Sequence, residues 1–225
     1  MTVRTDDLIA ALARGLTPVV PVATVRVRLA RWTGAALVTL AAAVWVVGAR
    51  GDWPAAIGEW PVQAHSLLLV IAGVFGALAA LHLAVPGERR GWSQAWAVCA
   101  ALAWLAWLGG ELALAAGTGE AAWRVGVSWS CAFKVIAAGL VPAVVLLVMV
   151  RRSAPLAPRA AAALAVLSAA SIGALGAEWM CPNTRPMHLL VWHALPVVAA
   201  TGFALLIGAS IVSARAAGDD VDLSG

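Results

Sequence analysis

Four residues are of types that could do thiol or metal chemistry, although their spacing matches no diagnostic motif: Cys131, Cys181, His188 and His193. The two thiols could form a disulfide if their Cα atoms came within about 7 Å of each other. Thiolate sulfur and imidazole nitrogen also bind the same transition metals, so the four residues are candidate ligands for a transient metal ion. We expect no resident cofactor. A buried, inert Cys131 is the alternative, because free cysteine packs like a small hydrophobic side chain.

Two ionisable residues, Glu111 and Lys134, lie inside apolar segments, where an unpaired charge is unfavourable. Both lie at a similar depth from the same edge of their segments, so we expect an intramembrane ion pair that holds two helices together. Lys134 also follows Cys131 by three residues and lies on nearly the same helix face. A cation there would favour the thiolate form of Cys131. A small transporter that uses Glu111 or Lys134 is an alternative.

Six apolar segments must position these side chains. The chain is 63% hydrophobic and 12% charged, with a mean hydropathy of +0.92. A helix needs about 20 apolar residues to cross about 30 Å of hydrocarbon. The sequence therefore predicts an all-α integral membrane protein, a bundle of six transmembrane helices over residues 30–212. The predicted spans are residues 30–48, 64–85, 94–116, 127–150, 160–177 and 188–212.

Arginine residues predict the orientation of this bundle, because cytoplasmic flanks of short-looped membrane proteins retain Lys and Arg. With the N-terminus inside, eleven arginines flank the inner ends of the spans and three flank the outer ends. Both termini are therefore predicted to be cytoplasmic, with Cys131 and Cys181 at the outer edge. Topology and attraction to anionic lipids explain the positive charge better than nucleic-acid binding does. The inner arginines are Arg4, Arg14, Arg26, Arg28, Arg31, Arg89, Arg90, Arg151, Arg152, Arg159 and Arg215, and the outer ones are Arg50, Arg124 and Arg185.

Residues 1–29 form an N-terminal arm that begins with a short amphipathic helix. Thr5 is expected to cap this helix, and acidic residues in its first turn suit the helix dipole. Such a helix is marginal in water, so it must fold against the lipid surface or against a protein groove. Residues 213–225 form a short cytoplasmic tail, and no part of the chain resembles a soluble catalytic domain, so we expect no enzyme and no catalytic residues. The apolar residues that recur at helical spacing in the arm are Leu8, Ile9, Leu12 and Leu16.

Two membrane redox functions are alternatives. Haem or quinone electron transfer would use histidines inside the bundle, but no span carries paired, opposed histidines. A thiol oxidoreductase subunit would use the cysteines, but the sequence contains no Cys-x-x-Cys motif.

The segment Cys181-Pro182, followed by Pro186-Met187-His188-Leu189-Leu190-Val191-Trp192-His193-Ala194-Leu195-Pro196, resembles the last outer loop and sixth span of the NrsF family. This family comprises membrane anti-sigma factors called negative regulators of sigma F. The opening Thr5-Asp6-Asp7-Leu8-Ile9, with Leu12, is also similar to that family, and the pattern of six short-looped spans covers essentially the whole chain.

The resemblance implies a bacterial inner-membrane protein whose partner is an extracytoplasmic-function sigma factor. It implies that the apolar residues of the arm hold that sigma factor, without direct contact to nucleic acid. It also implies that Cys131 and Cys181 sense heavy metals or oxidants on the periplasmic side. We therefore expect an anti-sigma factor that releases its partner under metal or oxidant stress.

Overall fold

The computed structural model describes residues 4–14, 22–85, 87, 91–117, 125–153 and 155–213. These residues are almost entirely helical. The expected contact residue Leu16 and residues 214–225 of the expected tail lie outside the described residues. The elements are α1 (Thr5–Ala13), α2 (Val25–Val47), α3 (Trp53–Ala56), α4 (Trp60–Leu83), α5 (Gly91–Gly117), α6 (Trp129–Arg151), α7 (Pro158–Met180), α8 (Pro186–Leu189), the π-helix η1 (Leu190–Ala194) and α9 (Leu195–Ser213).

Six helical segments are long and apolar enough to cross a membrane, which confirms the predicted fold class. Five are single helices, α2, α4, α5, α6 and α7, and the sixth runs through α8, η1 and α9. The first span begins at Val25, so the last five residues assigned to the arm belong to α2. The first turns of α2 accommodate three arginines: Arg26 and Arg31 are exposed, and the buried Arg28 donates to the carbonyl of Met149.

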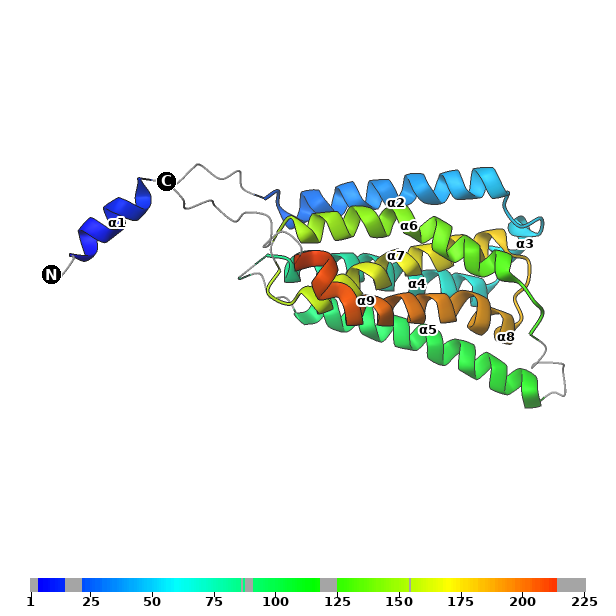
Figure 1. Cartoon of the computed structure of the whole chain (residues 1–225). Coiled ribbons are helices and arrows are strands. Elements are labelled where there is room, and N and C mark those ends of the chain that lie inside the picture. Colours follow the sequence, from blue (N-terminus) through cyan, green and yellow to red (C-terminus); the bar gives the residue numbers. More distant parts are fainter. Residues whose placement is uncertain are drawn as a thin grey trace.

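Helix α7 forms the centre of the bundle. In its most apolar 18-residue stretch 89% of the residues are buried, against 17% in α2 and 22% in α5. Its neighbours are α4, α6 and α9, while α2 packs mainly on α6 and α5 packs mainly on α4 (Figure 1). The small side chains of α7, mostly alanine, serine and glycine, allow this close packing from several sides.

Glycine sets the spacing between α6 and α7. A Cβ atom added to Gly139 of α6 would lie 2.9 Å from the carbonyl oxygen of Ala169 in α7. A Cβ atom added to Gly173 of α7 would collide with the carbonyl oxygen of Val135 in α6. The two backbones are therefore in direct contact, and this contact fixes the start of α6 relative to the end of α7.

The two ends of the bundle have different elements. Figure 1 shows that α2 begins and α9 ends at one end, which is also the side where α1 lies, whereas α3 and α8 lie at the opposite end. We call these the arm end and the cysteine end.

Helix α1 confirms the predicted arm helix but not its predicted cap. Arg4 precedes the helix, Thr5 is its first residue, and no side chain caps the first turn. Thr5 already has helical geometry, so the predicted capping role is wrong. Leu8, Ile9 and Leu12 all lie in α1, and Ile9 is 59% exposed.

Candidate metal and thiol site

Four elements at the cysteine end bring the four predicted residues together. Cys131 lies in the first turn of α6, and Cys181 follows the last residue of α7. His188 belongs to α8 and His193 to η1. All four side chains are buried, with relative exposures of 1 to 5%. Residues 50 positions apart in the sequence thus meet because α6 and α7 are held in backbone contact.

The four residues form one compact group. The Sγ atoms of Cys131 and Cys181 lie 3.2 Å apart, and Sγ of Cys181 lies 3.3 Å from Nε2 of His188. The rings of His188 and His193 meet edge to face, with centroids 5.6 Å apart. One sulfur or nitrogen atom from each of the four residues lies within 4.8 Å of all the others. Two sulfur and two imidazole nitrogen ligands are typical of protein sites that bind ions such as Zn²⁺.

Two nitrogen atoms of this group are buried without a hydrogen-bond partner, Nδ1 of His188 and Nε2 of His193. An unsatisfied buried polar atom costs about 1 to 3 kcal/mol. A metal ion bound among the four side chains could use one nitrogen atom of each histidine ring.

The π-helix explains how His193 reaches His188. In an α-helix, residues five apart point about 140° away from each other. In η1 the amide of Leu195 donates to the carbonyl of Leu190, five residues earlier, which widens the turn. Pro196 has no N–H to donate to the carbonyl of Trp192, so the regular α-helical bond is absent at this point. The π-helix was not predicted from the sequence. Pro196 is the residue that could have indicated it, because a proline removes one backbone hydrogen bond of the α-helix.

Burial dominates the electrostatics of Cys181. Desolvation raises the pKa of its thiol to about 11, and the hydrogen bond to Cys131 adds to the increase. The positive charge of Lys134 has a smaller, opposite effect on that pKa. The thiol form of Cys181 is therefore favoured over the thiolate near neutral pH. An ion that binds this thiol must displace its proton.

Aromatic side chains pack beside the two thiols. Cys131, Cys181 and Trp192 pack in one buried cluster, and the ring of Trp129 lies 4.9 Å from that of Trp192. The indole N–H of Trp192 donates to the carbonyl of Gly126, at 2.8 Å, which fixes the ring over the thiols. The Ser128 hydroxyl donates to Sγ of Cys131 at 3.3 Å.

The predicted ion pair between Glu111 and Lys134 is wrong. Nζ of Lys134 donates to the carbonyl oxygen of Met180, at 3.0 Å, immediately before Cys181. One carboxylate oxygen of Glu111 accepts from the indole N–H of Trp107, and the other lies 3.6 Å from His65. The physical reason is helix order, since α5 packs against α4 whereas α6 packs against α7 and α2.

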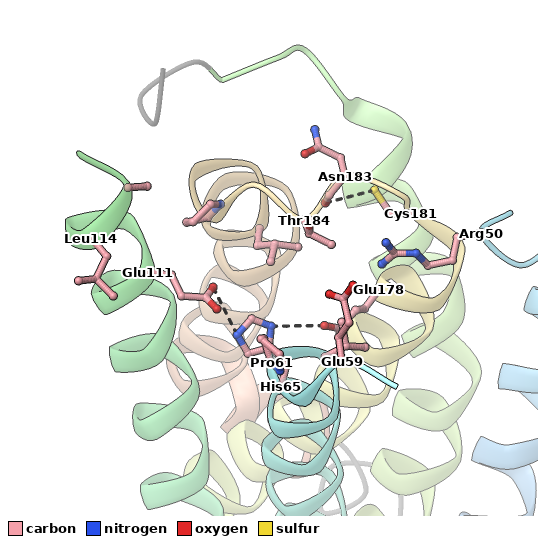
Figure 2. Close-up of a pocket in the computed structure, with 14 residues that line it drawn as sticks. Arg50, Glu59, Pro61, His65, Glu111, Leu114, Glu178, Cys181, Asn183 and Thr184 are labelled. Atoms are coloured by element: carbon pink, nitrogen blue, oxygen red, sulfur yellow. Dashed lines mark hydrogen bonds and ion pairs between the residues drawn. The ribbon is translucent and has the colours of Figure 1, made fainter. Parts of the chain in front are cut away.

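A polar cavity of about 360 Å³ adjoins the thiols, with Cys181 in its wall (Figure 2). His65 lies in this cavity between two carboxylates, Glu111 at 3.6 Å and Glu178 at 3.4 Å. Arg50 pairs with Asp52 through two hydrogen bonds of 2.6 and 2.7 Å. This bonding raises the pKa of Arg50 and lowers the pKa of Asp52. Sequence reasoning did not anticipate this cavity, because His65, Glu111 and Glu178 come from three different helices.

The third cysteine, Cys99, is exposed on α5 and takes no part in this group. His82 lies toward the arm end, in the last turn of α4, where its Nδ1 is 3.4 Å from the Ser93 hydroxyl.

The comparisons with known proteins bear on the function. A family model described as negative regulator of sigma F, NrsF, matches residues 12–213. The chain belongs to the NrsF family. No curated protein and no solved structure matches it. The family description names a negative regulator of a sigma factor, which supports the anti-sigma prediction. The NrsF match includes Leu12 and begins after Leu8 and Ile9.

Proposed function

We propose that this NrsF-family protein holds an extracytoplasmic-function sigma factor at the bacterial inner membrane and releases it when a heavy-metal ion binds Cys131, Cys181, His188 and His193. The observation that carries the proposal is the convergence of these four buried side chains at the end of the bundle opposite the arm. The cysteine end faces the periplasm and the arm end faces the cytoplasm, in accord with the arginine distribution.

The chemistry of the group favours a metal ion over an oxidant as the signal. Oxidants react with the thiolate form of cysteine, and the pKa of Cys181, at about 11, leaves very little thiolate. A soft metal ion instead gains two sulfur and two nitrogen ligands at once, and its binding energy displaces the protons.

The arm supplies the sigma-factor contact. Leu8, Ile9, Leu12 and Leu16 are the apolar side chains that would enter a groove on the partner, as amphipathic helices do. The exposure of Ile9 supports this role, since an exposed apolar side chain on a short helix gains stability from a partner surface.

Helix α6 is the route we propose between the two ends. It carries Cys131 at the cysteine end, and its carbonyl groups bind two residues of α2. The indole N–H of Trp32 donates to the carbonyl of Pro142 at 3.1 Å, and Arg28 donates to the carbonyl of Met149. A shift of α6 on metal binding would therefore move the start of α2, which follows the arm in the chain. Each tenfold loss of sigma-factor affinity requires about 1.4 kcal/mol of coupling.

Capture of a sigma factor tests this function. The full chain is co-expressed with an extracytoplasmic-function sigma factor of the same organism, and the membranes are sedimented. The sigma factor is expected to sediment with the wild-type chain and to stay soluble with a Leu8→Asp, Leu12→Asp variant. Thr5→Ser, on the same helix, is the matched control and keeps capture. Equal capture by the wild type and the double variant contradicts the assignment of the arm.

A further inference from the structure

We propose that His65 and Glu111 form a second, weaker cation site that binds a divalent ion of the zinc class and passes it to Cys181. The site lies in the polar cavity of about 360 Å³ at the cysteine end. Figure 2 shows His65 between Glu111 and Glu178, with Cys181 on the same cavity wall. Delivery to the thiols rests on the proposed function, whereas the existence of the site does not.

Glu178 orients the His65 ring. Its Oε1 atom lies 3.4 Å from Nδ1 of His65, and its Oε2 atom accepts from the Ser66 hydroxyl at 3.5 Å. The Glu178 carboxylate is itself buried, so a proton on Nδ1 gives it a partner. With the proton on Nδ1, Nε2 of His65 keeps a lone pair that can bind a metal ion. Metal-binding histidines commonly use a carboxylate on the second ring nitrogen in this way.

The other ring nitrogen is buried and has no hydrogen-bond partner. Nε2 of His65 lies 3.6 Å from Oε2 of Glu111, too far for a hydrogen bond. Two ligands about 2.1 Å from one tetrahedral ion stand about 3.4 Å apart, close to this distance. Glu111 is held in place because its Oε1 atom accepts from the Trp107 indole at 2.7 Å.

Charge in the cavity favours a cation. Three carboxylates line it, those of Glu59, Glu111 and Glu178. Among the described residues that line the wall, the single arginine is Arg50, which already pairs with Asp52. Negative charge therefore predominates in this lining and attracts cations from solution. Two protein ligands leave coordination positions for water, which makes the site weaker than the four-residue group. An ion bound there can exchange toward the Cys181 sulfur.

Equilibrium dialysis of the purified full-length chain against Zn²⁺ tests the site. The wild type is expected to bind a tight equivalent and a second, weaker one, and His65→Gln and Glu111→Gln each lose the weaker one. Glu178→Gln should weaken it by about 10- to 100-fold, since it removes the orienting carboxylate. His82→Gln, a buried histidine toward the arm end, is the matched control and retains both. Gel-filtration profiles check that each variant stays folded.

If His65 has only a structural role between the two carboxylates, the wild type should bind no second, weaker equivalent of Zn²⁺. That result overturns the proposal. A weaker equivalent that survives both His65→Gln and Glu111→Gln overturns it as well. Delivery is followed by the absorbance of Cd²⁺ bound to thiolate after mixing with Cd²⁺ alone. His65→Gln should slow its appearance without reducing its final amplitude, and an unchanged rate contradicts delivery. Since no sigma factor is present, these results are independent of the anti-sigma assignment.

Discussion

Single side chains determine the chemistry of the cysteine end. Cys131 and Cys181 are in contact, buried and next to two histidines, whereas Cys99 is exposed on α5 and far from them. Burial keeps the Cys181 thiol protonated, and the same burial leaves ring nitrogens of His188 and His193 without partners. The group therefore holds unused ligand atoms rather than a free thiolate.

Removal of either thiol should weaken metal binding. Cys131→Ser and Cys181→Ser each replace a soft sulfur ligand with a poorly binding hydroxyl, so we expect the Cd²⁺ affinity to fall by more than about tenfold. Titration of the purified chain with Cd²⁺, followed by thiolate absorbance, measures the change. Cys99→Ser is the matched control and should bind like the wild type. Wild-type affinity in both single variants would show that the thiols are not ligands.

The pH dependence follows from the Cys181 thiol. Its pKa of about 11 means that the proton must be displaced at every pH below that value. The apparent Cd²⁺ affinity should therefore rise with pH, by about tenfold per pH unit for each proton released. Titrations between about pH 6 and pH 8 check this slope. A flat profile over that range would mean that no thiol proton leaves on binding.

At the scale of the elements, packing of α6 on α7 places one cysteine against the other. The lengths and hydropathy of the spans were predictable from the sequence, because crossing a membrane imposes both on each helix separately. The sequence did not predict which helices are neighbours. The ion pair between Glu111 and Lys134 was wrongly predicted for this reason, because α5 and α6 were assumed to be adjacent. The four-residue group was predicted because all four residues lie toward the outer ends of their spans. The cavity was missed because it depends on how α4, α5 and α7 are arranged around it.

Glycine substitutions should reveal the contact between α6 and α7. Gly173→Ala places a Cβ against the Val135 carbonyl, and we expect a loss of about 1 to 3 kcal/mol of stability. Gly109→Ala on α5 meets open space, so it should be neutral or stabilising by up to about 1 kcal/mol. Thermal unfolding in detergent, followed by circular dichroism, compares the two. Equal unfolding temperatures would contradict the close approach of these helices.

At the scale of the whole molecule, the account requires that the two ends of the bundle face different compartments. An even number of spans places the start of α2 and the end of α9 at one end, and the metal group lies at the other. The arginine distribution predicts that the arm end faces the cytoplasm. Metal ions outside the cell and a sigma factor inside it can then act on opposite ends of one protein.

Labelling of single cysteines in intact cells checks this orientation. In a variant without native cysteines, Thr184→Cys, at an exposed position of the cysteine end, should react with an impermeant maleimide. Thr5→Cys, on the exposed face of α1, should react only after the cells are lysed. The reverse pattern would place the thiols on the cytoplasmic side and remove the basis for periplasmic sensing.

The most direct test of the central claim is release of a bound sigma factor by a metal ion. The complex of the full-length chain with its sigma factor is reconstituted in lipid nanodiscs, and Cd²⁺ is added while free sigma factor is measured. We predict release from the wild-type complex and retention by the complex that carries Cys131→Ser and Cys181→Ser. Release from both complexes, or from neither, would contradict the account.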